Sequence, residues 1–597
     1  MEISNSKIAK ILRNVAAAYT IKKIGNFFQI RAYENAADSI EQSTAEVYDL
    51  WQEGKLDQIP GSGESIRGYL DELFKTGKVK HFEEIEKGIP KIFFDLLDIP
   101  GVGPKTAQKI AELGVKDLED LKKKLKNGDL VNKGFSSKLA QNIISGLHEV
   151  SQRGNRMLLP YGYAQAEKIL NYLKKCPDVL QAHPLGSLRR MVATVGDLDF
   201  SASSNESKKV VDYFCQMSSV ARIVDQGENK ATVILQNGIQ ADLLVGRPGS
   251  YGALLQHFTG SKVHNIKLRT LANQQGYSLS EYGVKRAESG RWKVEDGKLI
   301  KTETEEEFYK LLGMDVPPPE LREDTGEIEV ALQHNLPKLV EFGDIKGDLH
   351  LHSSFPIEKP SHAPGVDSIE DIIKKAINLG YQYVGISDHS PSLTLPEDKV
   401  KATIEKRTKV IQFLKKNLPA GRQGTKSIRV LNGLEIDILG DGSLSVPDEV
   451  LETLDYCIAG IHSGHRGHKD EITKRLLAAL NNPHVDIISH PTNRLLNERE
   501  SSEADWETIF KLAAKNNKIL EINAYPNRLD LRDDLAREAK KYGVKFIINT
   551  DAHAVSQMDN MRFGVAVARR SWAEKRDIVN SWDWKKFAKW FNITYDK

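Results

Sequence analysis

Short apolar runs that alternate with longer helical segments dominate the second half of this sequence. Six such runs follow residue 341, at 383–386, 430–431, 458–461, 487–488, 518–522 and 545–548. Strands that are buried on both faces have continuous apolar sequences, and a repeated strand–helix alternation is typical of parallel sheets. We therefore predict that residues 341–597 form a barrel of parallel strands with helices around it.

Histidines and carboxylates directly follow most of these runs. Ten of the sixteen histidines lie after residue 340. A single histidine in such a place is more often structural than a metal ligand. In a parallel barrel, however, the residues after each strand meet at one end, and imidazoles with carboxylates bind Mn²⁺, Zn²⁺ or Fe²⁺. The sequence therefore predicts a centre of two or three ions. Its candidate ligands are His350, His352, His389, Glu435, His462, His490, Asp551 and His553.

The first half divides into a helical region and a mixed region. At 597 residues the chain is too long for one hydrophobic core, so three or four domains are expected. Residues 1–150 contain short amphipathic segments broken by glycine turns, for example at 43–54 and 105–114, which predict helices. From residue 182, β-branched runs such as 231–235, followed by the turn Asn237-Gly238, predict strands and hairpins in an α/β domain.

The composition excludes several classes of protein. No apolar run is long enough to span a bilayer and the first residues lack a targeting signal, which predicts a cytoplasmic protein with no membrane role. The three cysteines are far apart, so neither a disulfide framework nor a thiolate zinc site is expected. The net charge is only +2, so motifs rather than bulk charge must indicate a nucleic-acid partner.

Residues 59–63 and 99–103 share the pattern Ile-Pro-Gly-x-Gly, and a helical segment follows each copy. Glycines at this spacing let consecutive backbone N–H groups point outward at a helix N-terminus, where they can hold a phosphate without reading a base. One copy alone is as often a connecting turn, but two copies resemble the helix-hairpin-helix motif of DNA repair enzymes. The predicted contacts to the DNA backbone are Gly61, Gly63, Gly101, Gly103 and Lys105.

A group of aspartates follows the motif Gly186-Ser187-Leu188-Arg189-Arg190. Asp197 and Asp199 are two residues apart, so in a strand both carboxylates leave the same face, and Asp242 on a neighbouring strand can complete a trio. A lone Asp-x-Asp is commonly a solvated turn, but the preceding motif and Asp242 argue against that interpretation here. Three carboxylates suit paired Mg²⁺ or Mn²⁺ ions for phosphoryl transfer, and Ser187 and Arg190 can hold a triphosphate.

Residues 1 to about 320 resemble the family X DNA polymerases, relatives of DNA polymerase beta. Residues 257–265 are similar to the nucleotide-binding thumb motif of that family. The resemblance implies that the aspartate trio catalyses nucleotidyl transfer. The nucleotide-binding residues that it implies are Gly186, Ser187, Arg190, Phe258, Gly260, Asn265 and Arg269. The chain departs from the family at His257, where a Tyr is frequent, and at Leu244, where some members have Arg. Tyr69 stands where the Schiff-base lysine would be, so a deoxyribose phosphate lyase activity is not expected.

Residues 341–597 resemble the PHP domain, of the polymerase and histidinol phosphatase superfamily, most clearly at 347–352 and 488–492. This resemblance implies a (β/α)7-type barrel that hydrolyses phosphoesters with metal ions. The family usually has an aspartate shortly after the His-x-His pair, but none stands there in this chain. Glu358 is the first candidate to replace it and His362 the second. His465, His468 and His484 are expected to be surface or structural residues.

These features predict a multidomain chain of α+β and α/β classes. The expected parts are a helical DNA-binding domain with the first hairpin (1–85), a fingers-like helix-hairpin-helix domain (86–150), a nucleotidyltransferase palm (151–250), a thumb (251–318), a linker that begins near the prolines at 317–319 (319–340), and the PHP domain (341–597).

The order of these parts resembles the bacterial and archaeal family X polymerases that carry a PHP domain. It implies a DNA-directed DNA polymerase with 3′-5′ exonuclease activity that fills short gaps and trims 3′ ends in base excision repair. Expected partners are dNTPs and gapped, nicked or 3′-end DNA, with Mg²⁺ or Mn²⁺ at the palm; a monomer is expected. One alternative is a small-molecule phosphatase similar to histidinol phosphatase. Another is a DNA-end-binding protein with an inert polymerase half.

Overall fold

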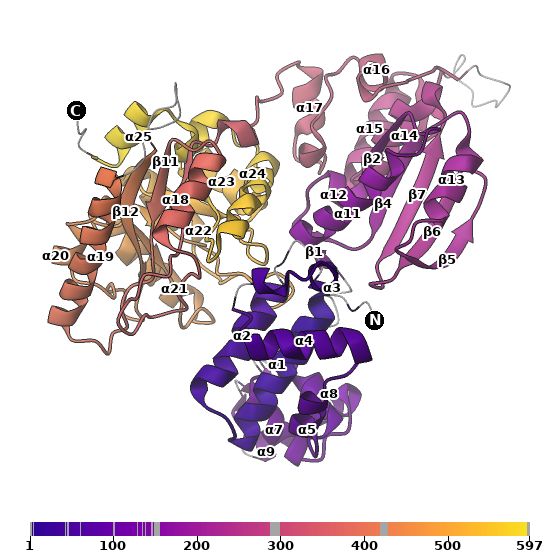
Figure 1. Ribbon diagram of the computed structural model, residues 1–597. Helices are drawn as coiled ribbons and strands as arrows, with labels where there is room; N and C mark the ends of the chain where they lie inside the picture. The colour runs from indigo at the N-terminus through magenta and orange to yellow at the C-terminus, as the bar shows by residue number, and fades with distance from the viewer. Residues whose placement is uncertain are drawn as a thin grey trace. The chain divides into compact units, whose positions relative to one another are not determined.

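The computed structural model describes residues 1–597 apart from 1–2, 4, 42, 44–46, 60, 100–101, 128, 134, 138, 142, 145–146, 148–155, 287–298, 418–427 and 594–597 (Figure 1). The chain divides into two compact units. The first comprises Met1–Pro184, Thr194–Val245 and Asn497–Arg499, and the second comprises Leu185–Ala193, Gly246–Leu496 and Glu500–Lys597. In the part of the chain that the structure describes, no helix combines the length and apolar content needed to cross a bilayer.

The N-terminal part of the first unit is helical, as the sequence predicts. One apolar core, which includes Leu12, Tyr33 and Phe74, lies among α1 (Asn5–Lys22), α2 (Phe27–Glu41), α3 (Val47–Gln52), α4 (Glu64–Thr76) and α5 (Lys80–Glu86), with η1 (Leu56–Gln58) beside them. A second core, which includes Phe93 and Ile110, lies among α6 (Lys91–Leu97), α7 (Pro104–Glu112), α8 (Leu118–Lys126) and α9 (Asp129–Asn132). The helices predicted near 43–54 and 105–114 are therefore α3 and α7.

The rest of the first unit is built on a five-stranded sheet, which confirms the predicted α/β region. Its strand order is β2 (Gln181–Pro184), β4 (Leu198–Ser203), β7 (Gln240–Gly246), β6 (Lys230–Leu235) and β5 (Val220–Gln226). The turn at Gly238, whose φ is +86°, joins β6 and β7 as an antiparallel hairpin. Also in this unit are α11 (Leu159–Leu173), α13 (Ser207–Cys215) and the short pair β1 (Met157–Leu158) and β3 (Thr194–Val195).

The second unit begins with short helices around a separate apolar core. The elements are α12 (Gly186–Arg189), η2 (Pro248–Ser250), α14 (Tyr251–Thr259), α15 (Lys262–Gln274), the hairpin of β8 (Tyr277–Ser280) and β9 (Gly283–Arg286), α16 (Glu305–Leu311), η3 (Pro319–Leu321) and α17 (Glu327–Leu332). The core includes Leu268, Phe308 and Ile328. Because Ile328 on α17 is buried in it, part of the stretch expected to be a linker is folded onto the preceding domain.

A barrel of seven parallel strands in sequential order forms the rest of the second unit (Figure 1). The strands are β10 (Gly347–Asp348), β11 (Tyr383–Ile386), β12 (Arg429–Asp437), β13 (Tyr456–Gly460), β14 (Ile487–Ile488), β15 (Ile519–Asn523) and β16 (Lys545–Asn549). All six predicted strands are confirmed, and β10 is added before the first histidine pair. A parallel bridge between Leu351 and Ala552 joins the chain after the first strand to the chain after the last, so the barrel is nearly closed.

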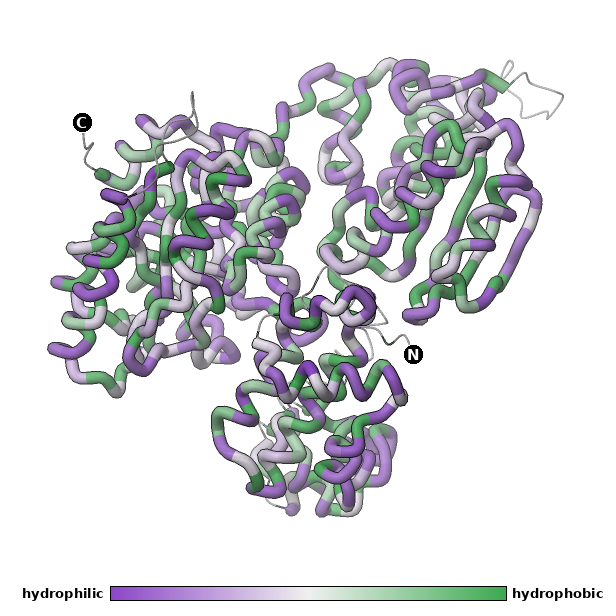
Figure 2. The backbone as a smooth tube through the Cα atoms, in the orientation of Figure 1, coloured by the Kyte–Doolittle hydropathy of each residue, from purple (hydrophilic) through white to green (hydrophobic). Residues whose placement is uncertain are grey.

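The barrel strands are buried and helices surround them (Figure 1), and hydrophobic and hydrophilic residues alternate along the tube in this part of the chain (Figure 2). These helices are α18 (Ile369–Asn378), α19 (Glu397–Asn417), α20 (Asp448–Leu451), α21 (Lys469–Asn481), α22 (Trp506–Lys515), α23 (Asp533–Lys541) and α24 (Met561–Arg570). The Tyr456 ring packs closely against β12, because a Cβ at Gly433 would lie 2.1 Å from it. The remaining elements are η4 (Phe342–Asp344), η5 (Val555–Asn560), η6 (Lys575–Asp577), η7 (Val579–Ser581) and α25 (Trp584–Trp590), whose Phe587 packs on Tyr383.

Candidate metal centres and binding residues

The barrel brings eight of the predicted ligands together at the carboxyl ends of its strands. In strand order from β10 to β16 they are His350 and His352, His389, Glu435, His462, His490, and Asp551 and His553. His553 is the most exposed of them, with a quarter of its side chain accessible, and the other side chains are at most one-tenth exposed. The side chains thus gather at one protected rim, as expected for a parallel barrel.

The Glu435 carboxylate occupies the middle of this cluster. Its Oε1 lies 3.2 Å from both His462 Nε2 and His490 Nε2. Its Oε2 lies 3.1 Å from His350 Nε2 and 3.0 Å from His389 Nδ1. One buried carboxylate therefore faces four imidazoles that come from four different strand ends. Glu435 and these imidazoles would be able to hold divalent cations between them.

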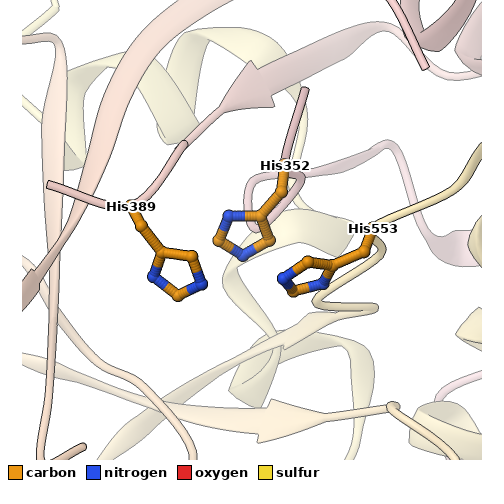
Figure 3. A group of neighbouring side chains, drawn as sticks. All are labelled: His352, His389 and His553. Atoms are coloured by element: carbon orange, nitrogen blue, oxygen red, sulfur yellow. The ribbon is translucent and has the colours of Figure 1, made fainter. Parts of the chain in front are cut away.

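The imidazoles of His352, His389 and His553 lie next to one another (Figure 3). The ring centroid of His352 lies 4.3 Å from that of His389 and 4.1 Å from that of His553. A ring nitrogen from each lies within 4.8 Å of the others. Asp551 completes this side of the cluster, because its Oδ1 lies 3.1 Å from His352 Nε2. Three imidazoles and a carboxylate are a donor set that divalent transition metals favour.

A further group lies on the other side of Glu435 and includes an aspartate that the sequence reasoning missed. Asp437 Oδ1 lies 2.6 Å from His462 Nδ1 and 3.2 Å from His362 Nε2. Asp437 is two residues after Glu435 on β12, so both carboxylates project from the same face of one strand. The same two-residue spacing that singled out Asp197 and Asp199 could have indicated Asp437.

The loop after His352 presents His362, and not Glu358, to this group. Glu358 is 51% exposed and its Oε1 lies 3.4 Å from Lys399 Nζ, in an ion pair with that lysine. The Ser361 backbone N–H donates to Ser390 O at 2.9 Å, which fixes the loop beside the segment that carries His389. The structure therefore does not bring the first candidate ligand to the centre, and the geometry favours the second candidate, His362.

Buried charged residues outside the predicted ligand set hold the ligands in place. Glu521 on β15 lies 2.8 Å from His350 Nδ1, which leaves the other ring nitrogen of His350 facing Glu435. Asp388 accepts a hydrogen bond from the Arg407 Nε at 2.6 Å, and both side chains are buried. A carboxylate placed like Glu521 fixes the orientation and tautomer of a ligating imidazole, whereas Asp388 holds the backbone N–H of Ser353, the residue after His352. Glu521 could have been recognised in the sequence, because it is a carboxylate inside an otherwise apolar run.

The donor atoms of the cluster fit divalent cations. Among the described residues, His350 Nε2, His389 Nδ1 and Glu435 Oε2 are buried without a hydrogen-bond partner, although they face one another. Burial alone would raise the pKa of Glu435, but His350, His389 and His462 outweigh it and hold that pKa well below its usual range. Burial lowers the pKa of His389 and of His490 to about 4. The centre thus combines an ionised carboxylate with two neutral imidazoles, those of His389 and His490, that can ligate. At His462, by contrast, Glu435 and Asp437 outweigh burial and raise the pKa to about 9, so a bound cation would have to displace that proton.

The predicted aspartate trio comes together in the first unit. Asp197 precedes β4, Asp199 lies on β4 and Asp242 lies on the adjacent strand β7. An oxygen of each lies within 4.8 Å of the others. Burial, together with the charges of Asp197 and Asp242, raises the pKa of Asp199 to about 7. Like charges held this close favour a divalent cation, which removes their repulsion.

The residues predicted to bind a nucleotide lie at α12, α14 and α15 in the second unit. Gly186 begins α12, with Ser187 next to it, and has a φ of +55°. A Cβ at Gly260 would lie 3.1 Å from Arg190 Nη1, so these two predicted residues are neighbours. Asn265 Nδ2 donates to His257 O at 2.7 Å.

Two further members of the predicted nucleotide-binding set lie close to His257. The Phe258 ring packs against the His257 ring, with centroids 4.7 Å apart, and Phe258 is 38% exposed. Arg269 Nη2 lies 3.2 Å from His257 Nδ1. The histidine that departs from the family pattern thus contacts both residues.

The two hairpin motifs precede α4 and α7. Gly61 has a φ of +73°, a left-handed conformation that favours glycine. Gly63 and Gly103 are the N-cap residues of these helices, and a Cβ at either would meet nothing within 4 Å, so their backbone is open to a ligand. Gly101 lies outside the described residues. The second motif suits a phosphate better, because exposed Lys105 follows it, whereas Glu64 begins the helix after the first.

Four segments of the chain match known protein families. Residues 3–79 match a helix-hairpin-helix domain, and residues 93–149 match a SAM-like helix-hairpin-helix tandem. Residues 254–323 match the DNA polymerase beta thumb, and residues 348–525 match the PHP domain. These matches cover both hairpin motifs, the thumb and most of the barrel.

Three curated proteins show how far these similarities extend. DNA polymerase/3′-5′ exonuclease PolX of Bacillus subtilis is 35% identical over 579 residues, which cover 96% of this chain and 97% of that protein. DNA polymerase lambda of Rattus norvegicus is 26% identical over 53% of this chain and 56% of its own length. A probable phosphatase of Clostridium acetobutylicum is 29% identical over 34% of this chain and 78% of its own length.

Proposed function

This chain belongs to the family X DNA polymerases that carry a C-terminal PHP domain, and we propose that it fills short gaps and trims 3′ ends of DNA in base excision repair. It is a DNA polymerase with 3′-5′ exonuclease activity that uses divalent metal ions. The observation that carries the proposal is that one chain joins an aspartate trio, two hairpin motifs and a histidine-carboxylate centre.

In the polymerase half, we assign nucleotidyl transfer to Asp197, Asp199 and Asp242. Their oxygens converge within 4.8 Å, which supports a role in holding paired Mg²⁺ or Mn²⁺ ions. Bound cations would lower the pKa of a primer 3′-hydroxyl and stabilise charge on the reacting phosphate. The nucleotide-binding residues in this proposal are Gly186, Ser187, Arg190, Phe258, Gly260, Asn265 and Arg269, and the incoming substrate is a dNTP.

In the PHP half, we assign phosphodiester hydrolysis to the centre around Glu435. Glu435 faces imidazoles from four strand ends, which supports a bridging role between Mn²⁺, Zn²⁺ or Fe²⁺ ions. Asp437 and His362 extend the proposed ligand set, and Glu358 is left out of it. Glu521 orients His350 from the side away from Glu435. The set is otherwise His350, His352, His389, His462, His490, Asp551 and His553.

Two alternatives fit the observations less well. A small-molecule phosphatase would need only the barrel, and the probable phosphatase of Clostridium acetobutylicum aligns with just 34% of this chain. A DNA-end-binding protein with an inert polymerase half would not need three converging carboxylates, yet Asp197, Asp199 and Asp242 are all present and close together. We further propose that the protein acts as a monomer in the cytoplasm.

Incubation of the purified protein with a 5′-labelled gapped duplex and Mn²⁺ tests this function directly. With dNTPs, the labelled primer should lengthen to the end of the gap; without dNTPs, it should shorten from its 3′ end. Substitution of histidinol phosphate for the duplex serves as the comparison for the phosphatase alternative. Release of phosphate from that ester together with an unchanged primer would refute the proposal.

Lys105→Glu should weaken DNA binding at the second hairpin motif. The new carboxylate would stand in the first turn of α7, where it repels a phosphate held by the helix N-terminus. We expect the Kd for duplex DNA to rise by about tenfold at low salt, equally for two unrelated sequences, because phosphate contacts carry no base information. Fluorescence anisotropy at matched salt measures this.

Lys109→Glu is the matched control for this prediction. It makes the same charge change on an exposed lysine of the same helix, but in the last turn rather than the first. Its Kd should rise less than that of Lys105→Glu. Equal effects of the two substitutions would show that net charge, and not the hairpin, determines the affinity.

A further inference from the structure

Arg190, the proposed triphosphate ligand, has its side chain fixed by bonds on two sides. Its Nε donates to Glu323 Oε1 at 3.0 Å, and its Nη1 donates to Thr259 O. The side chain is 14% exposed. Among the described residues, none bonds the remaining nitrogen, Nη2. The guanidinium is therefore oriented by the protein and keeps one nitrogen available for a phosphate oxygen.

The residue that completes this arrangement comes from the PHP barrel. Arg570 Nη1 donates to the backbone carbonyl of Arg190 at 2.9 Å and to Glu323 Oε1 at 3.1 Å. Arg570 Nε donates to Asp533 Oδ2 at 2.7 Å, and the Arg570 side chain is only 10% exposed. The same Glu323 oxygen thus accepts from both arginines, and Arg570 holds the backbone of Arg190 as well as its carboxylate partner.

Arg570 stands on a helix that is firmly part of the barrel. It is the last residue of α24, which packs against β15 and β16. This packing is close, because a Cβ at Gly564 on α24 would lie 2.5 Å from Ile548 Cγ2 and 2.9 Å from Ala524 Cβ. A bulkier residue there would push the helix away. The position of Arg570 is consequently fixed by the fold of the barrel, and that of Arg190 depends on Arg570.

We propose that Arg570 and Glu323 are positioning residues for Arg190, through which the PHP barrel sets the affinity of the polymerase for the incoming dNTP. The inference rests on the proposed role of Arg190 in binding the triphosphate. An arginine that is already oriented loses less conformational entropy when it binds a phosphate, so loss of its supports weakens binding of the nucleotide more than it slows the chemical step.

Steady-state primer extension by full-length Arg570→Ala on a one-nucleotide gap tests the proposal. We expect the KM for dNTP to rise by about tenfold, the scale of one oriented charge-assisted contact, while kcat stays within about twofold. Arg570→Lys keeps the charge without the fork of donors, so it should restore part of the loss. Resection without dNTPs should stay at the wild-type rate and shows that the barrel is folded. Glu323→Gln should also raise the KM for dNTP, because it weakens the bonds that Arg190 and Arg570 donate to this side chain.

Arg569→Ala is the matched control. Arg569 is the neighbouring residue on α24, and it bonds Glu320 at 2.7 Å and Val340 O at 3.2 Å, but not Arg190. Its removal loosens the same helix without touching Arg190, so the KM should change little. An equal rise in both variants would mean that Arg570 only docks the helix, and would overturn the proposal. A fall in KM would overturn it too, because Glu323 would then compete with the triphosphate.

A double-mutant cycle separates this inference from its premise. In an Arg190→Ala background, Arg570→Ala should add nothing further to the KM, because the residue through which it acts is gone. Additive effects would overturn the proposal. If Arg190→Ala alone leaves the KM unchanged, the role of Arg190 fails, and the inference fails with it. Absence of any extension by the wild-type protein would instead refute the proposed function.

Discussion

Asp199→Ala is expected to abolish primer extension while resection from the 3′ end continues at the wild-type rate. Asp199 lies on β4, and an oxygen of its carboxylate lies within 4.8 Å of an oxygen of Asp197 and of Asp242. Its removal takes one carboxylate from the paired-ion site. The variant should lose several kcal/mol of transition-state stabilisation, which corresponds to a decrease in extension rate of at least about 10³-fold.

Asp225→Ala is a suitable control for this prediction. Asp225 lies on β5 of the same sheet, is 52% exposed and pairs only at the surface with Lys230. An exposed ion pair contributes little to stability, so extension by this variant should be normal. Both variants are assayed on the 5′-labelled gapped duplex, with and without dNTPs. Extension by Asp199→Ala near the wild-type rate would remove the trio from the proposed mechanism.

Glu435→Gln should have the opposite effect, with loss of 3′ resection and normal polymerisation. The amide keeps the size of the side chain but loses the charge that faces His350, His389, His462 and His490. An amide is a poor bridge between cations, so metal content should fall and resection should slow by about 10²-fold or more. Metal analysis of the purified protein and timed resection without dNTPs measure the two effects.

Glu358→Gln makes the same chemical change at the position that the sequence had favoured. Because Glu358 is half exposed and pairs with Lys399, this variant should keep its metal and its resection rate. Comparable losses in both variants would show that the loop after His352 does supply a carboxylate, contrary to the geometry. Unchanged primer extension in each variant confirms that the rest of the chain is folded.

The sequence predicts the strands and most of the ligands, because in a parallel barrel the position of a strand determines where the residues after it lie. An apolar run fixes a strand, and the residue after it must lie at the rim, so His462 and His490 could be placed without any knowledge of packing. Asp197, Asp199 and Asp242 could be placed for a similar reason, because alternation along a strand and pairing of neighbours set their positions.

What could not be predicted depends on loop paths and on burial. Glu358 and His362 are four residues apart in a loop whose course is set by the hydrogen bond of Ser361 to Ser390 and by the close approach of Gly365 to His352 O. No periodicity in the sequence encodes such contacts. Arg570 is similarly hidden, since nothing around it in the sequence resembles a nucleotide-binding motif. Its importance arises from a contact across 380 positions of the chain.

The ligands of the barrel centre come from six of the seven strands, from His350 after β10 to His553 after β16. On the ribosome, which releases the chain from its N-terminus, the aspartate trio is therefore complete long before Asp551 and His553 exist. A nascent or prematurely terminated chain that lacks β16 can carry the polymerase residues but has an unfinished hydrolytic centre.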